Sequence, residues 1–406
     1  MNKLKKIISG ALLLSLSLCP LVSCGQKSAD TSATTDTDKV TDTTAEEEII
    51  TLPEYDFNSL DLALYIKLPE DYDSRDYSQG LTLKGEPTDK EILDAIRDGY
   101  LNELAEMKEL GADGVVADLD TVIMDYVGKL DGVAFQGGSA TDTEHAISLE
   151  NSTFIDGFDR GLIGMKAGET KDLELTFPDP YPNNTSLAGK AVIFTVTIDK
   201  IIRPEYPALT DSLITENTKI FGEEIKTVAE LTAATKKALE SEYKKYNDEL
   251  KIEAAWTYVT EESEYLSLPS DMLEGYKSTY LKSYEASAKQ NSTTLEQYAL
   301  ANGYLSLDDF KEKVIFTAAE NLLREKLVLY TTAKALSITV TEDEARELAN
   351  DEFKTYIEPN LAYYTMYYGI SDVETYMSYM GGVTAYKENL TFSRIVTKLC
   401  NIEAKE

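Results

Sequence analysis

The sequence of 406 residues predicts an α+β protein, because two different hydrophobic periods follow one another along the chain. From Thr121 onward, apolar and polar residues alternate, which is typical of strands in a small antiparallel sheet. One short helix is predicted near residues 158–163. After residue 202 apolar residues recur every three to four positions, so the second half is predicted to be all α-helical.

Each element follows from its own local pattern. The first strand of the sheet begins at Thr121. A proline-rich loop is predicted later in the sheet region, at residues 177–182. Later strands are predicted at residues 144–149, 170–176 and 191–201. Long amphipathic helices are predicted at residues 227–262, 270–289, 307–336, 341–356 and 384–402.

A further helix is predicted upstream of the sheet. Residues 88–91 (Thr-Asp-Lys-Glu) have the sequence of a capping box, which satisfies free backbone groups at the start of a helix. Apolar residues at helical spacing follow from Ile92 to Met107, and Gly111 is expected to end the helix. Residues 53–85 carry only short mixed segments, which suggest strands or extended chain.

Residues 1–23 have the pattern of a lipoprotein signal peptide. Three lysines precede an apolar stretch at residues 7–18, which is too short to span the ~30 Å hydrocarbon core of a membrane. Residues 21–25 (Leu-Val-Ser-Cys-Gly) resemble a bacterial lipobox, in which Cys24 would be lipidated. The alternative is an ordinary signal peptide with an incidental cysteine. We therefore expect an extracytoplasmic protein, anchored to the bacterial cell membrane as a lipoprotein.

Composition excludes some partners. Residues 24–52 are rich in Thr, Ser, Asp and Glu and cannot bury enough apolar surface to offset their ordering entropy, so a disordered acidic tether is predicted. The whole chain has 39 Lys and Arg against 72 Asp and Glu, a formal net charge of −33. Such a surface repels phosphates, so nucleic acid is not an expected partner.

The sequence offers few groups for metal or nucleophilic chemistry. Its single histidine, His145, cannot supply a multi-histidine metal site and is interpreted as an exposed strand residue rather than a catalytic one. With residues 1–23 removed and Cys24 lipidated, only Cys400 would remain as a thiol, so no intramolecular disulfide is expected. No cofactor and no metal are expected.

Three motifs in the predicted sheet region carry a resemblance to a known family. They are Asp131–Gly138 (DGVAFQGG), Phe154–Phe158 (FIDGF) and Gly164–Glu169 (GMKAGE). With them, residues 113–203 resemble the FKBP-type peptidyl-prolyl isomerase domain, in the version that trigger factor carries. The resemblance implies an FKBP-like antiparallel sheet with one short helix, and cis/trans isomerisation of X-Pro peptide bonds.

That reaction needs no nucleophile, metal or redox group. Rotation about an X-Pro bond faces a barrier of ~20 kcal/mol, because twisting destroys the amide resonance. The planar amide is polarised, whereas the twisted transition state has lost much of that polarisation. A dry, aromatic pocket with one or two hydrogen-bond donors therefore favours the twisted form.

The resemblance also implies which residues would form this pocket. Tyr181 would donate a hydrogen bond to the substrate carbonyl, and Phe158 would lie on the pocket floor. This chain departs from the family at Gln136, where many relatives have an acid, and at Phe158, where many have Trp. The alternative is that these aromatic residues are simply the core of a β domain. The predicted site residues are Tyr126, Phe135, Ile155, Phe158, Tyr181, Leu187 and Phe194.

Looser motifs follow in the helical half, at residues 206–211, 268–272 and 336–344. Through them, residues 204–406 resemble the C-terminal domain of trigger factor, which folds its helices around a cradle for unfolded chains. Eighteen of the 26 tyrosines lie between Tyr243 and Tyr386. They would serve either helix packing or contact with unfolded chains.

Together these patterns predict a lipid-anchored foldase. It would isomerise X-Pro bonds in secreted proteins and hold unfolded or nascent polypeptides that contain proline. One alternative is a holdase with an inactive isomerase pocket, and another is a solute-binding lipoprotein, against which the helical second half argues. The ribosome-docking signature of trigger factor has no match, so no ribosome binding is expected. The predicted parts are a signal peptide (1–23), a tether (24–52), a connecting segment with a helix (53–112), the isomerase domain (113–203) and a helical chaperone domain (204–406).

Overall fold

The computed structural model describes residues 50–402, except Ala112 and Asn151. The predicted signal peptide, Cys24 and most of the predicted tether lie outside the described residues. Within the part of the chain that is described, no helix combines the length and the apolar character that crossing a membrane requires.

The chain forms two compact units. The sheet unit comprises Gly85–Tyr243, and the helical unit comprises residues 50–84 and 244–402. The predicted connecting segment, residues 53–112, is therefore divided between the two units.

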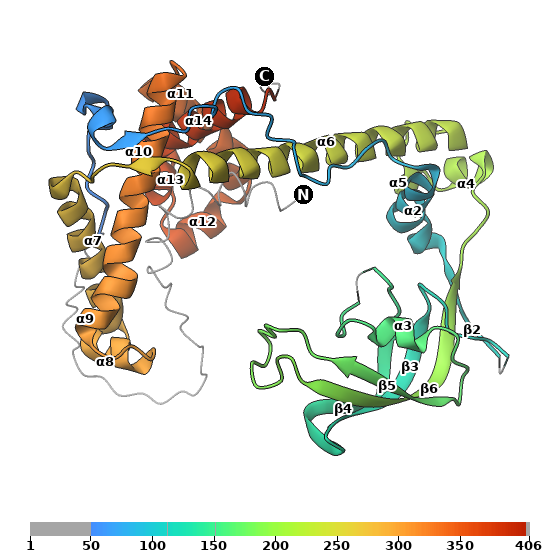
Figure 1. Ribbon diagram of the computed structural model, residues 1–406. Coiled ribbons are helices and arrows are strands. Elements are labelled where there is room, and N and C mark those ends of the chain that lie inside the picture. Colours follow the sequence, from blue (N-terminus) through green and yellow to red (C-terminus); the bar gives the residue numbers. More distant parts are fainter. Residues whose placement is uncertain (1–49, 112, 151, 403–406) are drawn as a thin grey trace, which may run out of the picture. The chain divides into compact units, whose positions relative to one another are not determined.

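The sheet unit is built around a five-stranded antiparallel sheet (Figure 1). Strand β6 hydrogen-bonds to β2, β3 and β5, and β4 pairs with β3. One short helix, α3 (Phe158–Leu162), packs against one face of the sheet. The strands are β2 (Glu106–Glu109), β3 (Thr121–Leu130), β4 (Val133–Ala146), β5 (Thr170–Thr176) and β6 (Ala191–Glu205).

The core of this unit follows from the period-two pattern of β6. Val192, Phe194, Val196 and Ile198 are all buried, whereas the residues between them are exposed or half-buried. Alternation of this kind turns one face of the strand toward α3 and the other toward solvent. The strands predicted at residues 170–176 and 191–201 are thus confirmed as β5 and β6.

Strands β3 and β4 form a hairpin closed by the two-residue turn Asp131-Gly132. Both turn residues have positive φ, 49° and 81°, a conformation whose twist matches that of the flanking strands. β4 therefore begins at Val133, whereas the sequence predicted a strand only at residues 144–149. Two consecutive glycines interrupt the apolar alternation of β4 and concealed its first half.

A buried ion pair joins the start of β3 to the end of β6. Asp120 is fully buried, and Arg203 donates two hydrogen bonds to its carboxylate, from Nε and Nη2, each of 2.7 Å. The Ala117 N–H donates to the same carboxylate, and Arg203 also donates to the Val115 carbonyl. Because a buried carboxylate needs hydrogen-bond partners, this pair fixes the loop that precedes β3.

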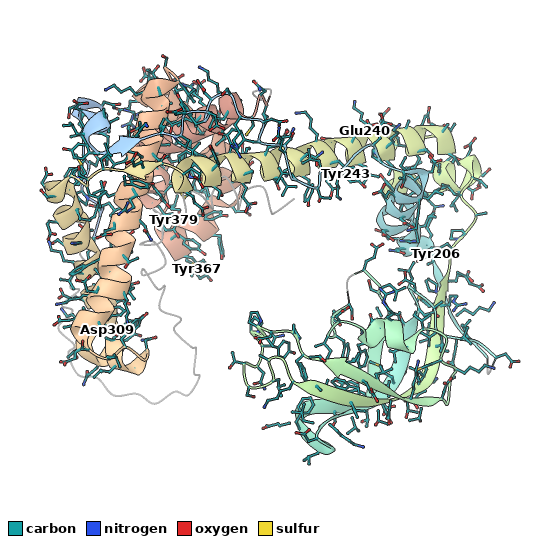
Figure 2. The ribbon with its side chains drawn as sticks, in the orientation of Figure 1. Tyr206, Glu240, Tyr243, Asp309, Tyr367 and Tyr379 are labelled. Carbon is teal, nitrogen blue, oxygen red and sulfur yellow. The ribbon has the colours of Figure 1, made fainter. Side chains whose placement is uncertain are left out.

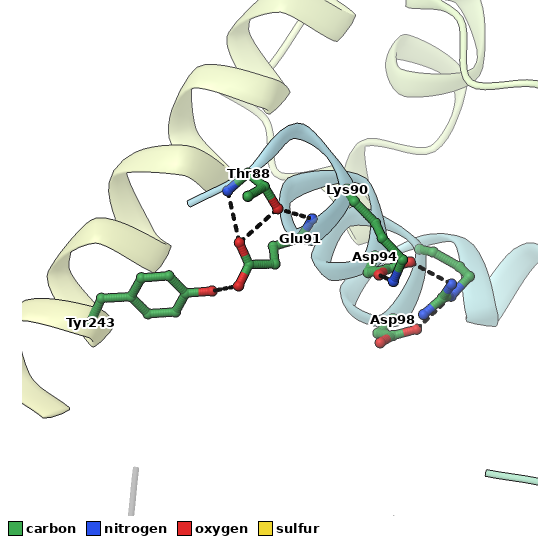
Figure 3. A network of polar contacts seen from close by, with 7 residues as sticks. Thr88, Lys90, Glu91, Asp94, Asp98 and Tyr243 are labelled. Atoms are coloured by element: carbon green, nitrogen blue, oxygen red, sulfur yellow. Dashed lines mark hydrogen bonds and ion pairs between the residues drawn. The ribbon is translucent and has the colours of Figure 1, made fainter. Parts of the chain in front are cut away.

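Helix α2 (Asp89–Gly99) begins with the predicted capping box and is tied to a second helix (Figure 3). The N–H and hydroxyl of Thr88 both donate to Oε2 of Glu91. The Tyr243 hydroxyl, from α6 (Val228–Glu261), donates to Oε1 of Glu91 at 2.6 Å. This hydrogen bond, together with burial, raises the pKa of Tyr243 to about 12.

Helix α2 is shorter than predicted. It ends at Gly99, and η4 (Leu101–Leu104) and β2 follow, so the prediction of a helix as far as Met107 is wrong. Gly99 is a poor helix former. Tyr100 leaves the helical conformation with φ of −135°, and its ring stacks on Phe221 with centroids 5.5 Å apart. Helices α4 (Asp211–Glu216) and α5 (Thr218–Phe221) complete this part of the sheet unit.

The helical unit has a core shared between its N-terminal and C-terminal segments. Phe57, in η2 (Phe57–Ser59), stacks on Tyr330 of α10 with centroids 4.8 Å apart. Strand β1 (Ile66–Lys67) pairs with β7 (Glu264–Tyr265). Residues 50–84 are therefore part of this unit rather than a free connection.

The predicted long helices are present, with additional short ones between them. The predicted helix at residues 307–336 contains a π-helical turn, η5, and the one predicted at 341–356 ends in another, η6. Helices α8, α12 and α13 were not predicted, because each is shorter than three turns. The elements are η3 (Leu62–Leu64), α7 (Ser270–Gln290), α8 (Leu295–Ala301), α9 (Leu307–Phe310), η5 (Lys311–Phe316), α10 (Thr317–Ala335), α11 (Glu342–Glu352), η6 (Phe353–Ile357), η7 (Glu358–Asn360), α12 (Leu361–Tyr368), α13 (Val373–Tyr379) and α14 (Gly382–Leu399).

The Asp120–Arg203 pair generates a stability prediction. Arg203→Ala leaves a buried carboxylate without its cation and is expected to lower the free energy of unfolding by about 3 kcal/mol, the lower end for a broken buried pair because Arg203 is partly exposed. Chemical denaturation measures this. The control is Lys200→Ala, which breaks an exposed pair with Glu109 and should cost less than about 1 kcal/mol. Equal effects of the two substitutions would contradict the prediction.

Candidate functional site

The predicted site residues all lie in one apolar cluster between α3 and the sheet. Phe158, Leu187 and Phe194 are buried, and the other four are half-buried against them. These residues come from β3, β4, α3, β6 and the loops before α3 and after β5, so separate segments of the chain converge here.

The ring of Phe158, the first residue of α3, lies at the centre of this cluster. Phe154 stacks on it with centroids 4.1 Å apart and an interplanar angle of 12°. Phe194 and Tyr126 approach it edge-on, at 5.5 Å and 6.2 Å. Offset-stacked and edge-to-face pairs are the favourable aromatic geometries. Gly157, with φ of 86°, provides the sharp entry into α3 that places the ring here.

Phe135 forms a second side of the cluster and depends on two glycines. Its ring centroid lies 5.9 Å from that of Phe177 and 6.4 Å from that of Phe194. A Cβ atom at Gly138 would lie 2.5 Å from Cζ of the Phe135 ring, and one at Gly128 would lie 2.8 Å from Cε1. The ring therefore rests directly on the backbone of β3 and β4, which only glycine permits.

Tyr181 lies in the proline-rich loop, with its ring centroid 5.1 Å from that of Phe177. Two backbone hydrogen bonds shape the loop, from the Asn184 N–H to the Tyr181 carbonyl and from the Leu187 N–H to the Asn184 carbonyl. Leu187 is buried and anchors the loop to the cluster. Over the described residues, the Tyr181 hydroxyl donates no hydrogen bond within the chain, so it can serve a bound carbonyl group.

Phe177 belongs to the same cluster but was not among the predicted site residues. It is buried and lies between the rings of Phe135 and Tyr181. The available signal was an aromatic residue at the end of a strand, immediately before a proline-rich loop. Gln136, at the family's acidic position, is exposed beside Phe135, so an amide stands there in place of a carboxylate.

The structure corrects the interpretation of His145. This residue is buried, not exposed, and its Nε2 atom lies 2.7 Å from Oδ1 of Asp159. The period-two pattern contained the signal for burial. Ile147, two residues further on, is buried, and residues two apart on a strand lie on the same face. Burial raises the pKa of Asp159, but hydrogen bonds from His145 and from the Ser148 N–H outweigh it, so the pKa lies below its usual value.

One group of carboxylates in the sheet unit has the spacing of a metal site. Side-chain oxygens of Asp125, Asp142 and Asp199 all lie within 4.8 Å of one another. All three are exposed or half-exposed, and Asp125 already accepts a hydrogen bond from the Asp142 N–H. Partial burial and the two neighbouring carboxylates raise the pKa of Asp199.

Comparison with known proteins identifies the family. Residues 113–199 match the model of the FKBP-type peptidyl-prolyl cis-trans isomerase, and residues 227–366 match that of the bacterial trigger factor C-terminus. The trigger factor of Bacillus subtilis (strain 168) is 30% identical over 322 residues, which cover 77% of this chain and 70% of that protein. The chain belongs to the trigger factor family.

Other members of the family show similar coverage. The trigger factor of Bacillus pumilus (strain SAFR-032) is 30% identical over 76% of this chain and 67% of its own length. The trigger factor of Bacillus licheniformis is 33% identical over 64% of this chain and 60% of its own length. This chain thus spans about two thirds of the length of these relatives. A solved structure of the trigger factor chaperone, from work on promiscuous substrate recognition, covers 83% of this chain with 16% identity and a TM-score of 0.37.

Membership of the trigger factor family confirms the predicted α+β fold. It also confirms the resemblance to this family, on which the fold prediction partly rested. The protein carries an FKBP-type peptidyl-prolyl cis-trans isomerase domain, followed by a helical domain of the trigger factor type. All seven predicted site residues fall inside the matched isomerase region. Their individual roles stay a prediction, as do the boundaries of residues 113–203 and 204–406.

Proposed function

We propose that this protein is an extracytoplasmic foldase anchored to the membrane by lipid. It isomerises X-Pro bonds in secreted proteins and holds their unfolded chains. The observation that carries the catalytic part is the convergence of all seven predicted site residues on the apolar cluster between α3 and the sheet. Most of these residues are aromatic, and we call this group the aromatic cluster.

The geometry of this cluster suits amide rotation. Its half-buried members offer apolar ring surface against which a substrate proline can lie, away from water. The Tyr181 hydroxyl donates a hydrogen bond to a carbonyl oxygen of the bound peptide. An environment of low polarity disfavours the polarised planar amide more than the twisted one, so the barrier falls. The members that a substrate can reach are Tyr126, Phe135, Phe154, Ile155 and Tyr181.

Holding of unfolded chains is assigned to an exposed aromatic surface of the helical unit. Helix α12 has the sequence Leu-Ala-Tyr-Tyr-Thr-Met-Tyr-Tyr, yet none of its residues is buried. We call four exposed large side chains of α12 and one of α13 the α12 patch, of which Figure 2 labels Tyr367 and Tyr379. The α12 patch consists of Tyr363 (52% exposed), Met366 (78%), Tyr367 (50%), Tyr368 (42%) and Tyr379 (46%).

The sequence left two uses open for the C-terminal tyrosines, and we assign them to different members of the group. Tyr376 and Tyr386 are buried and both donate to the carboxylate of Glu352, so they pack the helices. The α12 patch instead presents aromatic rings and a flexible thioether to solvent, as surfaces that bind varied apolar partners do.

Anchoring rests on the sequence of the first residues. The lipobox-like residues 21–25 and the acidic residues 24–52 support a lipidated Cys24 with a tether that an anionic membrane repels. The ribosome-docking signature of trigger factor, Gly-Phe-Arg, does not occur in the printed sequence, and we propose action away from the ribosome. The rival function is a holdase whose isomerase domain is inactive, which the exposed Gln136 beside Phe135 motivates.

Isomerisation of a proline-containing peptide by the purified chain separates the two functions. Tyr181→Phe is expected to lower kcat/KM about tenfold, since the loss of one hydrogen bond to the reacting peptide is worth about 1.4 kcal/mol. Phe194→Ala should abolish the rate but removes a core ring, so its folding must be checked by circular dichroism. Tyr246→Phe, on an exposed face of α6, is the matched control. An inactive parent protein would favour the holdase.

The α12 patch is tested by suppression of client aggregation. Replacing Tyr363, Met366 and Tyr367 together by Ser removes exposed apolar surface without opening a core, so suppression should weaken severalfold while thermal stability stays unchanged. The matched control replaces three scattered exposed residues, Leu64, Leu93 and Val133, by Ser. Equal loss in the control would argue against a localised patch.

Anchoring is tested in cells with Cys24→Ser. The parent should incorporate a labelled fatty acid and partition with membranes, whereas the variant should do neither, because one acyl-bearing residue supplies the anchor. Cys400→Ser is the control, because this thiol is part of the described helical unit and burial raises its pKa to about 11. Membrane retention of the Cys24→Ser variant would refute the anchor.

A further inference from the structure

The single histidine of this protein lies directly behind the aromatic cluster. His145, on β4, is 6% exposed, and its partner Asp159, on α3, is 2% exposed. The distance of 2.7 Å between Nε2 and Oδ1 is that of a strong hydrogen bond. Two titratable side chains are thus buried together beside the predicted site, and the proposed isomerisation mechanism uses neither.

Asp159 ties three segments of the chain together. It follows Phe158 in α3, and one carboxylate oxygen accepts from His145 of β4. The other oxygen accepts a hydrogen bond of 2.9 Å from the Ser148 N–H, in the connection between β4 and α3. A buried carboxylate is tolerated only when its oxygens are satisfied, so these bonds hold α3 in one position against β4.

The imidazole ring of His145 also contacts the aromatic cluster itself. Its centroid lies 4.8 Å from that of Phe154, edge-on, and 6.3 Å from that of Phe158. Phe154 in turn stacks on Phe158 and meets the ring of Tyr126 edge-on at 5.4 Å. A shift of the imidazole would therefore move Phe154 and Tyr126, two of the rings that a bound proline can reach.

We propose that His145 is a positioning residue for the isomerase, which orients Phe154 and Phe158 through its hydrogen bond to Asp159 and does not touch the substrate. This proposal rests on the proposed isomerase function. Histidine is the residue type that ordinarily changes charge near neutral pH, and the proposal gives the single histidine of this protein a role in the isomerase domain.

The side chains around His145 determine how its protonation affects the hydrogen bond to Asp159. Asp159, from α3, is the charged group in contact with the imidazole. Across the hairpin, β3 contributes the apolar Val122 opposite His145, and the connection before α3 contributes Phe154. Glu144, the neighbour on β4, is exposed on the opposite face. A protonated imidazole makes a charge-assisted bond to Asp159, so the rings are held most firmly when His145 is charged.

Two variants of the full-length protein separate positioning from stability. His145→Gln keeps an N–H donor near the Nε2 position but does not titrate, whereas His145→Phe keeps a ring and loses the hydrogen bond. We expect kcat/KM to stay within about twofold for His145→Gln and to fall about tenfold, mainly through KM, for His145→Phe. Ile201→Val, which trims a buried side chain of the same core on β6 that makes no hydrogen bond to Asp159, controls for lost stability.

The pH profile supplies a readout that a purely structural role would not move. For the parent, kcat/KM should decrease with rising pH, and the profile of His145→Gln should be flat. The NMR signal of ¹⁵N-labelled histidine, which needs no assignment because the chain contains one histidine, shows in the same samples whether the decrease accompanies loss of the imidazole proton.

The possible outcomes are distinguishable. An active parent whose pH profile and kcat/KM match those of His145→Phe would overturn the positioning role and leave the proposed isomerase function intact. A loss in Ile201→Val equal to that in His145→Phe would reduce the role of His145 to stability and overturn the proposal. An inactive parent would overturn the isomerase function, and this inference with it.

Discussion

Contacts of the buried Phe158 ring hold the isomerase domain and its predicted site together. The ring fills the space between α3 and the sheet, and the rings of Phe154, Tyr126 and Phe194 reach it from three different segments. The same ring is therefore both core and site. Because protein interiors are close-packed, the geometry offered to a proline and the stability of the domain are coupled through this one side chain.

Around this apolar centre, two buried carboxylates specify where loops must lie. Asp120 and its partner Arg203 fix the approach to β3, and Asp159 with His145 fixes α3. Buried charges of this kind add little net stability over apolar residues, but any arrangement that separates them is strongly disfavoured. A sheet covered by a five-residue helix thus gains a single defined geometry from polar contacts as well as from packing.

In the helical unit, one residue type serves two opposite purposes. Tyr376 and Tyr386 are buried because the carboxylate of Glu352 satisfies their hydroxyls, and this environment raises the pKa of both. Tyr363, Tyr367 and Tyr368 of α12 are exposed, and their rings remain available to an apolar partner. Composition alone cannot separate these uses, because each depends on what lies across from the ring.

By itself, the sequence determined the α+β class, the strands at residues 170–176 and 191–201 and most long helices, since hydrophobic period is a local property. Through its resemblance to the FKBP-type isomerase domain, the sequence also predicted that Tyr126, Phe158 and Phe194 lie in one pocket. Only the tertiary structure decided that α2 stops at Gly99, that Phe177 joins the aromatic cluster and that His145 is buried on Asp159. Each of these depends on a partner distant in sequence, and no local pattern encodes where that partner will be.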